Sequence, residues 1–112
     1  MENDRAIPAL AALAQPTRLD VFRLLVRHEP GGLPAGEVAR QLGIPHNTLS
    51  SHLGILARAG LVRSARNGRS IVYRADVAQV SALAAFLLED CCRGRPDACA
   101  PALPALANPR GP

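Results

Sequence analysis

The chain contains no lysine and no tryptophan, and it has few aromatic residues of any kind. All thirteen basic residues are arginine, and the aromatic residues are Phe22, Tyr73 and Phe86. Ala and Leu supply most of the 48 % apolar content, so the composition favours helices over sheets. A length of 112 residues provides one hydrophobic core and excludes a second, catalytic domain.

Long apolar runs are also missing. No run approaches the roughly 20 residues that a membrane span needs. The amino terminus opens with Glu2, Asn3 and Asp4 and has no apolar region of the kind found in signal peptides. We therefore expect a cytoplasmic protein with no membrane partner.

Acidic residues are absent from the middle of the chain. Residues 38–75 contain six arginines and no Asp or Glu, so this window carries a charge of +6 while the remainder carries −2. A concentrated positive charge indicates a polyanionic partner such as nucleic acid. Taken alone, the same charge is also compatible with an ordinary solvated surface.

Helical periodicity and turn residues divide the chain into short elements. Pro8 and Pro16 are placed in first helical turns, and Asp76 is expected to cap the last helix. Asn67-Gly68 is a strong hairpin signal between two β-prone runs. The predicted helices are 7–14, 16–28, 34–42, 46–59 and 76–90, and the predicted strands are 61–63 and 70–73.

The order of these elements predicts a winged helix-turn-helix, a mainly α fold with a small β-hairpin wing. A short helix, a tight turn, a longer helix and a basic hairpin follow one another in residues 34–75. In this arrangement the longer helix is placed to enter a DNA major groove. We assign residues 1–92 to the DNA-binding and dimerisation domain and residues 93–112 to a Pro-rich segment that contains a cysteine.

The longer helix separates apolar from polar residues. At 100° per residue, Leu49, Leu53 and Leu56 lie on one face, and a short polar face lies opposite. Asn can read adenine and Ser can contact bases or phosphates, although plain exposure also accounts for two serines. His52 borders the leucine face and is expected to be packed and hydrogen-bonded. The predicted DNA contacts from the helix and wing are Asn47, Thr48, Ser50, Ser51, Arg58, Arg66 and Arg69.

Three segments resemble the ArsR/SmtB family of metal-sensing repressors. They are Gln15–Arg18, Thr48–Leu56 and Ala59–Val62, and the resemblance covers residues 5 to 92. It implies a homodimer whose first and last helices pair across a two-fold axis. It also implies binding to an imperfectly palindromic operator and repression of resistance genes until an inducer binds.

Two apolar stripes agree with the implied dimer because a small monomer offers them few partners. The predicted interface residues are Ile7, Leu10, Leu13, Val77, Val80, Leu83, Phe86 and Leu87.

The cysteines indicate which inducer the family resemblance would predict. The arsenic site on the third helix has no cysteine here, and the zinc-type site of the last helix lacks its histidines, at Ala78 and Glu89. Cys91, Cys92 and Cys99 instead resemble the carboxy-terminal three-cysteine site of one arsenic-responsive subclass. Three soft thiolates suit trivalent arsenic (arsenite) or antimony better than tetrahedral zinc, and no organic cofactor is expected.

Several alternatives remain open at this point. The cysteines could form a thiol redox switch, bind another thiophilic metal or have no sensing role. A thiol-rich metalloid carrier is the rival from a different class. An enzyme is disfavoured because Ser50 and His52 lie on different faces of one helix and no carboxylate pair is nearby.

Overall fold

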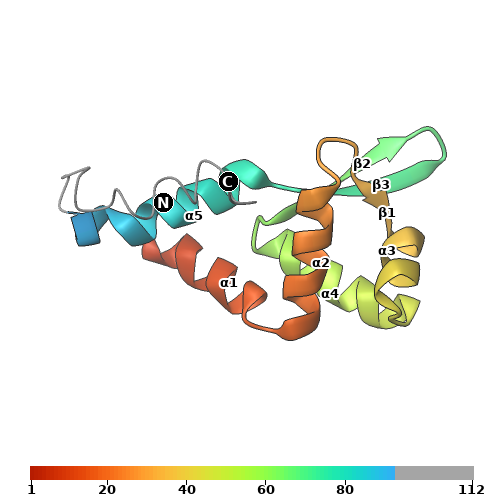
Figure 1. Cartoon of the computed structure of the whole chain (residues 1–112), viewed down its shortest axis with the longest axis horizontal. Coiled ribbons are helices and arrows are strands. Elements are labelled where there is room, and N and C mark those ends of the chain that lie inside the picture. The colour runs from red at the N-terminus through yellow and green to blue at the C-terminus, as the bar shows by residue number, and fades with distance from the viewer. Residues whose placement is uncertain (93–112) are drawn as a thin grey trace, which may run out of the picture.

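A computed structural model describes the backbone of residues 1–92 and the side chains of residues 1–89 (Figure 1). Figure 1 shows the hairpin at one end of the molecule and α5 at the other. The elements are α1 (Asn3–Leu13), α2 (Pro16–Arg27), β1 (Leu33–Pro34), α3 (Ala35–Leu42), α4 (His46–Arg58), β2 (Val62–Asn67), β3 (Ser70–Ala75) and α5 (Val77–Cys92). This order confirms the predicted winged helix-turn-helix.

Helix α1 starts earlier than the sequence predicted. It begins at Asn3, so Pro8 lies inside the helix and not in its first turn. Ala6, Ala9 and Ala12 are buried, and these small side chains let the helix approach the core closely. Because Pro8 is exposed, the backbone hydrogen bond that proline cannot donate is lost near solvent.

The corner between α1 and α2 is held by side-chain hydrogen bonds to the backbone. The Gln15 side chain accepts a hydrogen bond from the backbone N–H of Arg18 at 2.8 Å and so caps α2, which begins at Pro16. The Arg18 Nε atom donates to the carbonyl of Ala12 at 2.7 Å. The predicted start of α2 is therefore confirmed, and Arg18 ties the two helices together.

The turn between α3 and α4 is as short as predicted. Helix α3 ends at Gly43, which adopts a left-handed conformation with φ of 65°. The backbone N–H of Ile44 donates to the carbonyl of Ala39 at 3.1 Å. Pro45 then precedes α4. The helix-turn-helix is thus built by a left-handed glycine followed by a proline that favours a new helix.

The wing belongs to a sheet of three strands in the order β1-β3-β2. Strands β2 and β3 pair antiparallel from Val62 opposite Ala75 to Asn67 opposite Ser70, which confirms the hairpin. Strand β1 was not predicted, because its two residues carry no periodicity. Leu33 pairs with Tyr73, so β1 ties the wing to the segment that follows α2.

Gly32 makes the approach of β1 to β3 possible. Its φ is 75°, and a Cβ atom at this position would lie 2.6 Å from the carbonyl oxygen of Tyr73. Both the backbone conformation and the available space therefore require glycine here.

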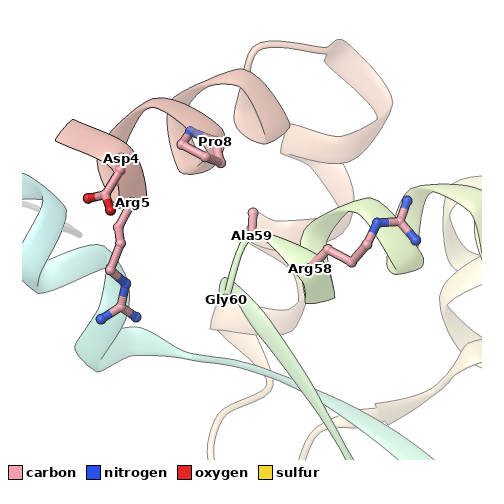
Figure 2. A pocket seen from close by; sticks show the side chains of 6 residues that line it. All are labelled: Asp4, Arg5, Pro8, Arg58, Ala59 and Gly60. Carbon is pink, nitrogen blue, oxygen red and sulfur yellow. The ribbon is translucent and has the colours of Figure 1, made fainter. Parts of the chain in front are cut away.

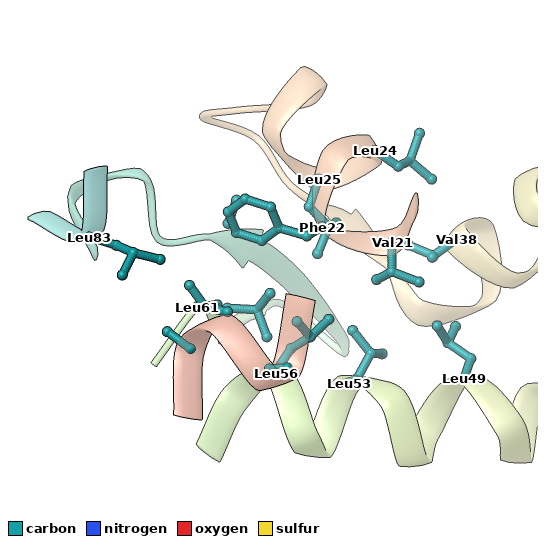
Figure 3. Close-up of a cluster of buried hydrophobic side chains, with 14 of the residues drawn as sticks. Val21, Phe22, Leu24, Leu25, Val38, Leu49, Leu53, Leu56, Leu61 and Leu83 are labelled. Carbon is teal, nitrogen blue, oxygen red and sulfur yellow. The ribbon is translucent and has the colours of Figure 1, made fainter. Parts of the chain in front are cut away.

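The core lies between α2 and α4. Leu53 and Leu56 project from α4 toward Val21 and Phe22 of α2, and Leu49 projects toward Val38 of α3 (Figure 3). The buried apolar residues form one cluster, which α1, α3, the base of the wing and α5 complete. This packing fixes which side of α4 faces outward.

Asp76 connects α5 to the wing. Its Oδ1 atom accepts a hydrogen bond from the backbone N–H of Gln79 at 3.1 Å, which confirms the predicted cap. Its own N–H donates to the carbonyl of Leu61 at 2.8 Å. None of the helices in the described part of the chain is long and apolar enough to cross a membrane.

We predict that Gly32→Ala destabilises the fold much more than Gly43→Ala. Both glycines have positive φ, but a Cβ atom at Gly43 would meet nothing within 4 Å. The left-handed conformation alone costs about 1–2 kcal/mol, so Gly43→Ala should lose about that much. Gly32→Ala should lose more than about 3 kcal/mol, because the clash with Tyr73 is added. Urea unfolding at one fixed protein concentration measures both, and equal losses would contradict the close contact.

Candidate nucleic-acid interface

The outward face of α4 is polar and exposed. Asn47, Ser50 and Ser51 are exposed, whereas Leu49 and Leu53 are buried. The predicted separation of the two faces is therefore confirmed. Asn47 and the two serines can contact base edges or phosphates without rearrangement of the core.

The amino end of α4 is open to an anion. Pro45 occupies the cap position and makes no side-chain cap hydrogen bond. The Asn47 Oδ1 atom accepts from the backbone N–H of Thr48 at 2.9 Å, while the Ser51 hydroxyl lies 3.4 Å from the Asn47 carbonyl. Helix amino ends carry partial positive charge, so this end suits a DNA phosphate.

Arg58 extends the polar face toward the carboxyl end of α4. Figure 2 shows its side chain pointing away from Pro8 of α1 and back along α4. A Cβ atom on Gly54 would lie 3.7 Å from the Arg58 Nη1 atom. The absence of a side chain at Gly54 therefore lets the Arg58 guanidinium lie close to the backbone of α4.

Ion pairs neutralise three of the six arginines in the basic window. Arg40 pairs with Glu37, Arg63 pairs with Asp76 at 3.7 Å, and Arg74 pairs with Glu29 at 2.7 Å. All three carboxylates come from outside residues 38–75. The +6 charge of the window therefore overstates the positive charge available to a ligand.

Within residues 38–75, the arginines that form no ion pair are Arg58, Arg66 and Arg69. These three are the arginines that the sequence predicted as DNA contacts, although the ion pairs could not be seen in the sequence. Arg66 lies opposite Ile71 near the tip of the wing, and Arg69 is in the turn between β2 and β3. Both are exposed, so the wing tip carries positive charge away from the core.

Glu29 orients the wing through Arg74. The Arg74 Nε and Nη2 atoms donate to the two carboxylate oxygens of Glu29 at 3.2 and 2.7 Å. These hydrogen bonds raise the pKa of Arg74. Glu29 follows α2 and Arg74 lies on β3, so the pair ties the wing to the second helix. Sequence reasoning missed this contact because the partners are far apart in the chain.

The expectation for His52 is wrong in one respect. The His52 Nδ1 atom is buried, as a packed histidine requires, but it has no hydrogen-bond partner among the described residues. The position beside the leucine face of α4 is as predicted.

The apolar stripes differ in how far they are exposed. On α1, Ile7 is 63 % exposed and Leu10 is 41 % exposed, because the alanines of the same helix face the core. On α5, Val77 and Leu87 are 43 % and 52 % exposed. The outer faces of these two helices therefore remain uncovered within one chain.

Leu83 departs from the predicted interface. It is buried in the core of its own chain, and Val80, Phe86 and Leu13 are half-buried against the same core. These residues hold α5 and α1 to the rest of the chain. Ile7, Leu10, Val77 and Leu87 are the predicted interface residues that stay free for a partner.

The described residues offer little space for an organic ligand and no cluster of metal-ligating side chains. A pocket of about 160 Å³ lies between α1 and the end of α4, lined by Asp4, Arg5, Pro8, Arg58, Ala59 and Gly60. Pockets for organic ligands usually measure about 300 Å³ or more. No group of three metal-ligating side chains occurs within the residues described here. The Cys91 and Cys92 side chains and the whole of Cys99 lie outside these residues.

Comparison with protein families matches residues 13–65 to a helix-turn-helix domain. The biofilm growth-associated repressor of Xylella fastidiosa is 38 % identical over 74 residues, which cover 66 % of this chain and 62 % of the repressor. This chain therefore aligns with less than two thirds of that relative's length.

The similar solved structures are also transcriptional regulators. An ArsR-like transcriptional regulator from Rhodococcus sp. RHA1 is 30 % identical with a TM-score of 0.67, over 75 % of this chain and 76 % of that one. A homodimeric winged helix-turn-helix DNA-binding domain from Mycobacterium bovis is 29 % identical with a TM-score of 0.62, over 82 % and 86 %. A structure described as a possible transcriptional regulator for arsenical resistance is 30 % identical with a TM-score of 0.61, over 70 % and 79 %.

We predict that the unpaired arginines dominate the salt dependence of binding to double-stranded DNA. Each contact with a phosphate steepens the slope of log K against log salt by about 0.9. Arg58→Gln, Arg66→Gln and Arg69→Gln should therefore each flatten the slope by about that amount per protomer. Fluorescence anisotropy with a labelled duplex at several KCl concentrations measures the slope.

Arg63→Gln is the matched control, because Arg63 lies on the same wing but pairs with Asp76. It should change the slope much less. If Arg63→Gln flattens the slope as much as Arg66→Gln does, ion pairing does not decide which arginines bind DNA.

Proposed function

The chain belongs to the ArsR family of winged helix-turn-helix transcriptional regulators, and from this premise we propose that it is a homodimeric repressor that binds operator DNA. The observation that carries the proposal is the polar outer face of α4 together with the unpaired arginines of α4 and the wing. Members of this family are regulators and not enzymes.

The dimer places two such faces on one duplex. Successive major grooves on one side of DNA are about 34 Å apart. A two-fold dimer that holds its α4 helices at this spacing binds an imperfect palindrome. The homodimeric state of the Mycobacterium bovis relative supports the dimer. The exposed apolar residues on α1 and α5 supply the contact area.

We predict that Ile7→Glu and Leu87→Glu each convert the dimer to a monomer. Both side chains are more than half exposed within one chain, so a carboxylate leaves the monomer folded but is desolvated in the dimer. Sedimentation equilibrium measures the mass. Binding to a palindromic duplex selected from random DNA should weaken in parallel.

Leu19→Glu is the control for this experiment. Leu19 is 41 % exposed on α2 and lies outside the two stripes. It should leave the mass unchanged. If all three variants remain dimeric, the interface does not involve these faces of α1 and α5.

The inducer in this proposal is arsenite or trivalent antimony, bound by Cys91, Cys92 and Cys99. Two of the cysteines lie in the last two residues of α5, and α5 carries part of the dimer interface. A ligand there can shift α5 and thereby change the spacing of the two α4 helices. Support comes from the soft thiolate set and from the relative described with arsenical resistance.

We predict that arsenite releases the selected DNA from the protein and that Cys91→Ser, Cys92→Ser and Cys99→Ser weaken this release. A hundredfold loss of DNA affinity corresponds to a coupling of about 3 kcal/mol. Because coupling is reciprocal, DNA should weaken arsenite binding by the same factor. Titration of the protein–DNA complex followed by anisotropy measures both.

The outcomes separate the alternatives. If the triple serine variant releases DNA as the parent does, the cysteines are not the sensor. If an oxidant releases DNA and arsenite does not, the protein is a thiol redox switch on the same fold. If the protein binds arsenite but no duplex at moderate salt, it is a metalloid carrier.

A further inference from the structure

The outer face of α3 carries an ion pair with unusually complete hydrogen bonding. The Arg40 Nε atom donates to Glu37 Oε2 at 2.9 Å, and Arg40 Nη2 donates to Glu37 Oε1. Gln41 Nε2 donates to the same Oε1 atom at 3.0 Å. Hydrogen bonds from Arg40 and Gln41 lower the pKa of Glu37 to about 2, so this carboxylate stays charged wherever the protein binds DNA.

This pair does not hold parts of the fold together. Both residues lie on α3, three positions apart, and the Arg40 side chain is 70 % exposed. The other two pairs differ. Glu29 ties α2 to the wing through Arg74, and Asp76 caps α5 while pairing with Arg63. Loss of the Glu37 charge therefore leaves every contact between elements in place.

Arg40 lies beside the amino end of α4. A Cβ atom on Gly36 would be 3.6 Å from the His46 Nε2 atom, so the side chain of the first residue of α4 reaches the first turn of α3. Arg40 follows Gly36 by four residues and hence shares its face of α3. Figure 1 shows the start of α4 lying against α3. Arg40 is thus at the margin of the proposed DNA surface, next to a helix end that suits a phosphate.

We propose that Glu37 withholds Arg40 from the DNA backbone and thereby limits the affinity of the protein for double-stranded DNA. The inference rests on the proposed DNA-binding function. A phosphate that approaches the Arg40 guanidinium also approaches the carboxylate bonded to it, so repulsion from Glu37 offsets part of the attraction. While Arg40 stays paired with Glu37 it neutralises no phosphate, so its presence releases no counterion from the DNA. Arg40 becomes a phosphate contact only when Glu37 loses its charge.

The test compares Glu37→Gln, Arg40→Gln and the double variant in salt titrations with a labelled duplex. One added phosphate contact in each protomer should steepen the salt slope of Glu37→Gln by about 0.9 per protomer, or about 1.8 for the dimer, and raise affinity about eightfold per contact at 0.1 M salt. Arg40→Gln should bind like the parent, because the arginine is already masked. The double variant should also bind like the parent, because the gain requires Arg40.

Asp20→Asn controls for the change in net charge. Asp20 is exposed on α2, and the substitution adds the same +1 charge without freeing an arginine. It should leave the salt slope unchanged. Glu37→Ala serves as a second variant, and thermal unfolding of each variant confirms that the fold is retained.

Three results would overturn the inference. They are a parental slope for both Glu37 variants, a gain that persists in the double variant, and a loss of slope in Arg40→Gln as large as in Arg66→Gln. A parent protein that binds no duplex at all overturns the proposed function itself. If the parent protein binds the duplex and the Glu37 variants show the same affinity and salt slope as the parent, only the proposed role of Glu37 is overturned.

Discussion

The packing of one face of α4 against the core is the constraint on which the DNA surface depends. Leu49, Leu53 and Leu56 are buried in the core below α2 and α3, and each contributes roughly 1.5–3 kcal/mol relative to an exposed side chain. Rotation of α4 about its axis would expose all three. Burial of the leucines, which stabilises the fold, therefore also keeps the polar face with Asn47 and Ser50 directed outward. No additional contact is needed to fix the orientation of that face.

Ion pairing then determines which arginines of the DNA surface are available to a ligand. Arginines alone supply the positive charge, and their planar donors form two-point hydrogen bonds with carboxylates as readily as with phosphates. Glu29 uses this property to orient the wing through Arg74, while Arg66 and Arg69 stay unpaired within the described residues. One residue type thus serves as a structural link at the base of the wing and as a ligand contact at its tip.

The sequence predicted the features that arise from nearby residues. The leucine spacing of α4, the Asn-Gly hairpin and the Asp76 cap are local patterns, and all three are confirmed. Strand β1, the partners of Arg40, Arg63 and Arg74, and the burial of Leu83 were missed. The strand, Leu83 and Arg74 with Glu29 depend on tertiary packing. The Arg40 pair is local, but an exposed helical pair is visible in sequence only as a spacing of charges.

Helix α5 carries the proposed signal over a considerable length. At 1.5 Å per residue, the backbone of Cys91 lies about 22 Å from Asp76. Asp76 contacts the backbone of Leu61 and pairs with Arg63, so the start of α5 is fastened to the segment that joins α4 to the wing. A continuous helix transmits a displacement at one end to the other with little bending. A ligand at the carboxyl end of α5 can therefore act on the DNA-binding elements through two kinds of contact. One is the polar junction at Asp76, which links α5 to the segment between α4 and β2, and the other is the packing of Leu83 in the core of the same chain.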